Sequence, residues 1–130
     1  MRAITDASVK GGKSTHSYIL QTWEGKIIKE RKFTGFADKP SEAELQTIET
    51  LLQYCLDKGF DKIKIYTDCQ SIVNAIKNDR NENIDVTYLK FLLKQTNSKL
   101  RWVKRDKVAR CDYNCRNVFK PRIKKGKLIG

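Results

Sequence analysis

The chain has 130 residues, enough for one domain that buries roughly two thirds of its chain surface around a single core. Its apolar content of 39% is that of an ordinary globular protein, and no apolar run approaches the roughly 18 residues needed to span a bilayer. The formal net charge of +12 excludes an acidic or neutral surface and favours an anionic partner.

The first part of the chain predicts a strand followed by a hairpin. Residues 2–5 form a short strand that ends at Asp6, and the small, polar residues 7–14 are typical of a loop. Residues 17–23 and 26–33 favour β-structure and are joined across a Glu-Gly turn, so they predict two antiparallel strands.

A helix is predicted to begin at Ser41, because Ser41 and Glu44 have the spacing of a capping box. Gly59 is expected to end this helix. Its apolar face is formed by Leu45, Ile48, Leu52 and Cys55. Residues 63–67 then predict a second strand, which ends at Asp68.

The remaining elements are two helices, a strand and a final helix. A short helix is predicted over residues 71–77, and the polar residues 78–83 separate it from another. The apolar side of that second helix is Val86, Leu89, Phe91, Leu92 and Leu93. Residues 100–103 predict the last strand and residues 112–119 a final helix. This order of elements predicts an α/β domain with a mixed sheet covered by helices.

Basic residues are concentrated at the C-terminal end. The last 30 residues hold 11 of the 27 Lys and Arg but only 2 of the 15 acidic residues. Such a segment attracts phosphates, and Trp102 adds a stacking surface. A solubilising tail and contact with anionic membrane are the alternatives, but no amphipathic apolar face accompanies the charge. We therefore expect nucleic acid, and no membrane, as the partner.

The cysteines are interpreted as packing residues. The N-terminus reaches a charged residue too soon for a secretory signal, so we expect a cytoplasmic protein with reduced thiols. The spacing of the cysteines matches no common zinc pattern, and the single histidine, His16, is expected to pack in the first hairpin. The four cysteines are Cys55, Cys69, Cys111 and Cys115.

Four carboxylates occupy informative positions. Asp6 and Asp68 each end a predicted strand, Glu44 lies in the first turn of a helix, and Asp112 begins the last helix. If the two strands are parallel neighbours, their carboxylates project at one edge of the sheet, where Glu44 can reach them. Two divalent cations bound there could clamp the attacking and leaving oxygens of a phosphodiester. Taken singly, each acid also has a structural explanation as a turn or helix-end residue.

The segments around these acids read ITDAS at residues 4–8, AEL at 43–45, IYTDCQ at 65–70, and WVKRD at 102–106 followed by Cys111-Asp112. They resemble the motifs T-D-G-S, A-E-L, T-D-S-Q, and W-V-x-R-E with A-D of ribonuclease H type I and its reverse-transcriptase-like relatives. The resemblance implies an RNase H-like catalytic domain over residues 1–119, with a five-stranded mixed β-sheet flanked by α-helices. Residues 120–130 would form a basic C-terminal tail.

The same resemblance implies a metal-dependent endoribonuclease that hydrolyses the RNA strand of RNA/DNA hybrids. We expect the protein to be a monomer. Its catalytic and metal-binding residues would be Asp6, Glu44, Asp68 and Asp112, with two Mg²⁺ ions as cofactor and Mn²⁺ as an alternative. The expected nucleic-acid-binding residues are Ser8, Lys10, Lys13, Ser41, Gln70, Arg105, Lys124 and Lys125.

Departures from the family pattern concern substrate choice and turnover. Residues 105–111 lack the histidine that many members carry before the last acid, a feature compatible with slow turnover. Residues 39–41 read Lys-Pro-Ser where many members have Thr-Asn-Asn, which leaves the selectivity for hybrids open. Two alternatives therefore remain: an RNase H-fold nuclease with another nucleic-acid substrate, and a catalytically impaired nucleic-acid-binding module.

Overall fold

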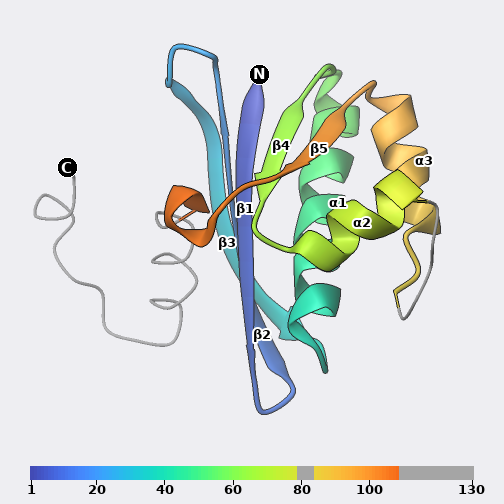
Figure 1. Ribbon diagram of the computed structural model, residues 1–130. Helices are drawn as coiled ribbons and strands as arrows, with labels where there is room; N and C mark the ends of the chain where they lie inside the picture. Colours follow the sequence, from blue (N-terminus) through green and yellow to red (C-terminus); the bar gives the residue numbers. More distant parts are fainter. Residues whose placement is uncertain (79–83, 109–130) are drawn as a thin grey trace, which may run out of the picture.

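The computed structural model describes residues 1–78 and 84–108, in which five strands form one sheet with three α-helices beside it (Figure 1). The strands are β1 (Arg2–Lys10), β2 (Lys13–Gln21), β3 (Ile27–Phe36), β4 (Lys64–Thr67) and β5 (Lys99–Trp102). The helices are α1 (Pro40–Lys58), α2 (Gln70–Asn78), α3 (Thr87–Gln95) and the 3₁₀ helix η1 (Arg105–Val108). The sheet order β3-β2-β1-β4-β5 combines antiparallel and parallel pairs, which confirms the expected five-stranded mixed sheet flanked by helices.

Strands β1 and β2 form a hairpin that the sequence did not predict, whereas the hairpin predicted over residues 17–33 corresponds to β2 and β3. Residues 7–14 were expected to form a loop, yet β1 pairs with β2 in an unbroken antiparallel register as far as Lys10 opposite Lys13. The two-residue turn is formed by Gly11 and Gly12, whose φ angles are +60° and +79°. A turn of this kind continues the twist of the flanking strands, so residues 7–10 and 13–14, which were predicted to lie in a loop, belong to the two strands instead.

Helix α1 begins differently from the prediction. Lys39 is the N-cap residue and no side chain caps the helix, so the expected capping box of Ser41 and Glu44 is not formed. Pro40 begins the helix, as its fixed φ permits, and Glu42 accepts a hydrogen bond from the backbone N–H of Asp38. This leaves the carboxylate of Glu44 available to the sheet. At the other end, Gly59 is the C-cap residue with a φ of +75°, so the predicted end of the helix is confirmed.

The hydrophobic core lies between the sheet and the helices. It contains Ala3 and Ile65 from the central strands, Leu52 from α1 and Leu89 from α3, all fully buried. Phe91 was expected on the apolar side of α3, but its side chain is 52% exposed and stacks on Tyr88 instead. None of the helices within the described ranges is long and apolar enough to cross a membrane.

Strands β1 and β4 are parallel neighbours, as the interpretation of the acidic residues required. Their pairing covers Arg2 to Ile4 opposite Lys64 to Tyr66. Strand β4 ends at Thr67, whereas β1 continues to Lys10. Asp6 therefore lies in the middle of a strand and not at its end, contrary to the prediction. It nevertheless lies level with the carboxyl end of β4, where Asp68 follows.

Several predictions concern residues outside the described ranges. The final helix over residues 112–119 and the basic tail over residues 120–130 belong to this group, as does most of the polar turn over residues 78–83. The domain boundary at residue 119 therefore stays a prediction.

Candidate active site

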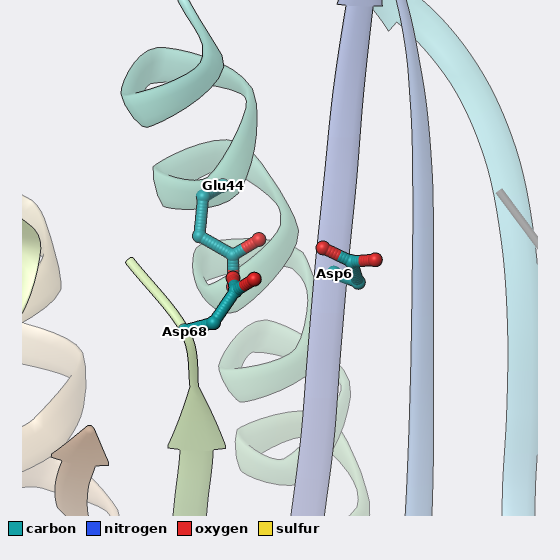
Figure 2. Close-up of side chains that lie close together, drawn as sticks. All are labelled: Asp6, Glu44 and Asp68. Carbon is teal, nitrogen blue, oxygen red and sulfur yellow. The ribbon is translucent and has the colours of Figure 1, made fainter. Parts of the chain in front are cut away.

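Three carboxylates meet where β4 ends, and they come from three separate segments of the chain (Figure 2). Asp6 is on β1, Glu44 is in the first turns of α1, and Asp68 directly follows β4. One oxygen from each lies within 4.8 Å of the others. Asp6 and Glu44 are almost fully buried, with 1% and 3% exposed, and Asp68 is partly exposed. The sequence prediction that these three acids converge is confirmed.

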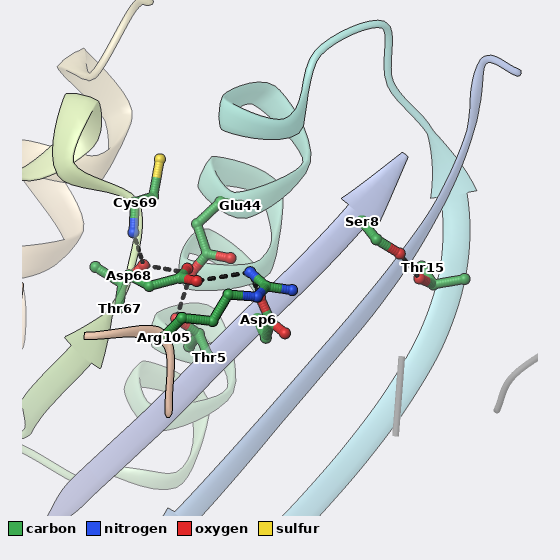
Figure 3. Close-up of polar contacts among 9 residues, drawn as sticks. All are labelled: Thr5, Asp6, Ser8, Thr15, Glu44, Thr67, Asp68, Cys69 and Arg105. Carbon is green, nitrogen blue, oxygen red and sulfur yellow. Dashed lines mark hydrogen bonds and ion pairs between the residues drawn. The ribbon is translucent and has the colours of Figure 1, made fainter. Parts of the chain in front are cut away.

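Two threonine hydroxyls hold the carboxylate of Glu44. Thr5 and Thr67 each donate a hydrogen bond of 2.6 Å to Oε2 of Glu44 (Figure 3). Burial raises the pKa of Glu44 to about 7, and the nearby charge of Asp68 acts in the same direction. The threonine hydrogen bonds and Arg105 oppose that rise in the pKa. Helix α1 thus holds the carboxyl group of Glu44 in a fixed position. A cation bound nearby would lower its pKa and favour the ionised form.

A guanidinium group lies against the other two carboxylates. Arg105, at the start of η1, donates a hydrogen bond of 2.7 Å to Oδ2 of Asp68, and its Nη1 lies 3.7 Å from Oδ1 of Asp6. About half of the Arg105 side chain is exposed. It supplies part of the positive charge that three neighbouring carboxylates need.

The donor set fits a hard divalent cation. All three side chains offer carboxylate oxygens, which are the ligands that Mg²⁺ and Mn²⁺ prefer. Burying carboxylates side by side is costly unless positive charge compensates them, and Asp6, Glu44 and Asp68 could hold a cation that adds to the charge of Arg105. Asp112, the fourth predicted ligand, lies outside the described residues.

The predicted nucleic-acid contacts are distributed around this cluster. Ser8 lies two residues beyond Asp6 on β1 and shares a hydrogen bond of 2.6 Å with Thr15. Lys10 and Lys13 are exposed at the tip of the β1–β2 hairpin. The other described residues of the set are Ser41 in the first turn of α1, the exposed Gln70 at the start of α2, and Arg105. Lys124 and Lys125 lie outside the described residues.

The side chains that orient Glu44 were not predicted from the sequence. Thr5 and Thr67 each precede a site aspartate in a Thr-Asp pair, and that repeated pair was the available signal. His16 was expected only to pack, and it is fully buried. Its Nδ1 also lies 3.1 Å from the carbonyl oxygen of Ala43 and 2.8 Å from Oγ1 of Thr47, so it joins β2 to the turn of α1 that carries Glu44.

Comparisons with known proteins agree with this architecture. Residues 5–118 match the reverse transcriptase-like family. A search of curated proteins finds no match.

Several solved RNase H structures are similar to this chain over most of its length. RNase H1 from the halophilic archaeon Halobacterium salinarum NRC-1 is 21% identical, with a TM-score of 0.79 over 89% of this chain and 94% of that one. LC11-RNase H1, isolated from compost and solved in complex with an RNA/DNA hybrid, is 15% identical, with a TM-score of 0.68 over 86% and 91%. The N-terminal RNase H domain of a Mycobacterium tuberculosis protein is also 15% identical, with a TM-score of 0.69 over 89% and 91%. Similarity at these identities establishes the fold, which is the RNase H-like fold expected from the sequence.

Proposed function

Because the chain belongs to the reverse transcriptase-like family, we propose that it is a ribonuclease H that hydrolyses the RNA strand of RNA/DNA hybrids with the help of divalent metal ions. The observation that carries this proposal is the cluster of Asp6, Glu44 and Asp68 at the carboxyl end of β4. The hybrid bound by LC11-RNase H1, which has the same fold, supports the choice of substrate.

The roles of the acids follow from their positions. Asp6, Glu44 and Asp68 would hold Mg²⁺ or Mn²⁺, and Asp112 would complete the set. When bound, such ions lower the pKa of water and stabilise the charge that develops on a phosphodiester during hydrolysis. Thr5 and Thr67 keep Glu44 directed at the other two carboxylates, which lowers the cost of assembling the ligands.

The substrate would lie over the β1–β2 hairpin and the start of α2. Lys10 and Lys13 would contact backbone phosphates, which hold nucleic acid in position without reading its sequence. Ser8, Ser41 and Gln70 would supply hydrogen bonds to the strand at the site. The basic residues Lys124 and Lys125 would add electrostatic affinity that depends on salt.

The first experiment measures cleavage of a labelled RNA/DNA hybrid in Mg²⁺, beside the same RNA alone and the same hybrid with chelator. Asp6→Asn removes a ligand charge but keeps the shape of the side chain, so we expect it to abolish cleavage. Asp61→Asn, which changes an exposed acid in the segment between α1 and β4, is the matched control and should cleave normally.

Three results would contradict the proposal. Cleavage that persists in Asp6→Asn or in chelator would exclude the metal mechanism. Cutting of single-stranded RNA as fast as the hybrid would assign another substrate. Binding of the hybrid without cleavage by the wild-type protein would indicate a binding module.

A further inference from the structure

A group of basic side chains lies side by side on strands β1, β4 and β5. The parallel register aligns Arg2 with Lys64 and Lys64 with Lys99, so these three cations form one row across the sheet. The next row toward the active site contains Tyr66 opposite Arg101. Neighbouring strands are about 4.8 Å apart, so each row brings its side chains close together. We call Arg2, Lys64, Lys99 and Arg101 the basic sheet face.

This face is turned away from the helices. Side chains alternate along a strand, and Ala3, Ile65 and Leu100 point into or pack against the core beneath α1 and α3. The basic residues at the intervening positions therefore point to the opposite side. Figure 1 shows α1, α2 and α3 together on the other side of the sheet. Lys99 and Arg101 are exposed, and Arg2 and Lys64 are partly exposed.

The charge on this face is hardly neutralised by the strands themselves. Apart from Asp6, the five strands carry one acidic residue, Glu30, and it lies on β3 at the far edge of the sheet. Two of the cations contact neighbouring side chains. Nε of Arg2 donates a hydrogen bond of 2.7 Å to Oε1 of Gln21. The Nζ of Lys64 lies 5.7 Å from the ring centroid of Trp23.

Aromatic rings accompany the cations. Trp23, in the turn between β2 and β3, is 51% exposed beside Lys64. Tyr66 lies opposite Arg101, two residues after Lys64 on β4, and is partly exposed. Rings of this kind can stack on unpaired bases. Bases paired inside a duplex already stack on one another and cannot use such a surface.

We propose that the basic sheet face is a second nucleic-acid-binding surface, and that it binds a single strand. Arg2, Lys64, Lys99 and Arg101 would contact phosphates, and Trp23 and Tyr66 would stack on bases. The row of Tyr66 and Arg101 is two residues, roughly 7 Å, from the level of Asp6 and Asp68. A single-stranded extension of a substrate held at the active site could therefore continue onto this face. The surface itself does not depend on bound metal.

The test measures binding of a short labelled single-stranded oligonucleotide by fluorescence anisotropy in chelator, at several salt concentrations. The variant carries Lys64→Gln, Lys99→Gln and Arg101→Gln. Loss of three phosphate contacts should weaken binding and reduce the slope of log affinity against log salt by about 2, at roughly 0.7 per contact. Because no cleavage is measured, failure of this test leaves the proposed nuclease function untouched.

The matched control removes the same charge elsewhere. Lys58→Gln, Lys77→Gln and Lys94→Gln change three exposed lysines on α1, α2 and α3. This variant should keep most of the affinity and the slope. Equal losses in both variants, or no loss in the first, would overturn the proposal. The proposal would also be overturned if the protein bound phosphatidylserine vesicles through the basic sheet face but did not bind the oligonucleotide. That result would indicate a membrane-binding surface.

A spectroscopic measurement keeps the basic residues intact. The chain has two tryptophans, so Trp102→Phe leaves Trp23 as the only fluorescent indole. Stacked bases should quench Trp23 fluorescence as the oligonucleotide is added, and the quenching should saturate together with the anisotropy. Bound oligonucleotide without any change in Trp23 fluorescence would exclude the stacking role.

Discussion

Glu44 combines a buried carboxyl group with a raised pKa, and that combination predicts how stability depends on pH. The native state holds the Glu44 proton more tightly than the unfolded state, because the pKa rises from 4.5 to about 7 on folding. The resulting stabilisation is complete below pH 4.5 and is lost as the pH rises through 7. Without metal, Glu44 therefore makes the protein less stable at pH 8 than at pH 5, by at most about 3 kcal/mol.

Urea unfolding in chelator across this pH range checks the effect. Glu44→Gln keeps the acceptor for the hydroxyls of Thr5 and Thr67 but cannot ionise, so it should remove this part of the pH dependence and stabilise the metal-free protein at pH 8. His16, whose pKa burial lowers, contributes in the opposite direction, and the difference between wild type and variant isolates Glu44. The same pH dependence in both proteins would show that Glu44 is not the group responsible.

Arg105 lies where its charge would compete with a bound cation. Its contacts with Asp68 and Asp6 stabilise the metal-free cluster, whereas a divalent ion at the same carboxylates would repel it. Arg105→Gln should therefore bind Mn²⁺ more tightly and be less stable without metal. Because the side chain is half exposed, we expect about 1 kcal/mol for each effect, which is about fivefold in affinity. Titration calorimetry would measure the affinity of both proteins for Mn²⁺. Weaker Mn²⁺ binding by the variant would show that Arg105 supports metal binding and does not compete with it.

At the level of elements, the hairpin of β1 and β2 depends on its two-glycine turn. Gly11 and Gly12 both have positive φ, which costs a residue with a Cβ about 1 kcal/mol. Gly11→Ala should lower the free energy of unfolding by about that amount, whereas Gly11→Asn should cost less because Asn tolerates this conformation. Thermal unfolding would compare them. Equal stability of all three proteins would mean that the turn does not constrain the hairpin.

The order of the elements was predictable because buried strands and helices differ in the periodicity of their apolar residues. Their ends were harder to predict, since they depend on contacts made across the fold. Residues 7–10 pair with β2 only because Gly11 and Gly12 reverse the chain, and Lys39 replaces Ser41 as the N-cap because Pro40 begins α1. Phe91 looks apolar in any window of sequence, yet it faces solvent beside Tyr88.

The candidate site was predictable to the extent that its acids follow recognisable local patterns. Asp6 lies on β1 and Asp68 directly follows β4. These two strands proved to be parallel neighbours, which brings both acids together with Glu44. The hydrogen bonds of Thr5 and Thr67 to Glu44 were not predictable, because they depend on which face each strand turns toward α1. The contact of Arg105 with Asp68 likewise requires the position of η1 relative to β4.

For the whole molecule, the acidic cluster exists only in the folded state. Its members are 38 and 24 residues apart along the chain, so unfolding separates them. A metal that binds the native state alone stabilises it by about 2.7 kcal/mol at 100 times its dissociation constant. Adding Mg²⁺ or Mn²⁺ should therefore raise the Tm of the wild-type protein. Asp6→Asn should show a much smaller rise, and an equal rise in both proteins would place the metal elsewhere.

The alternation of Thr5 with Asp6 makes the site sensitive to changes in chain length. Thr5 must face α1 to reach Glu44, and its neighbour must face the other way. Deleting one residue from the start of β1, with the rest of the strand shifted to compensate, would put Ala7 in the place of Asp6 and Asp6 in the place of Thr5. Insertions and deletions within β1 should therefore destroy the site even where the strand itself still pairs, because each one exchanges the faces toward which the residues of β1 point.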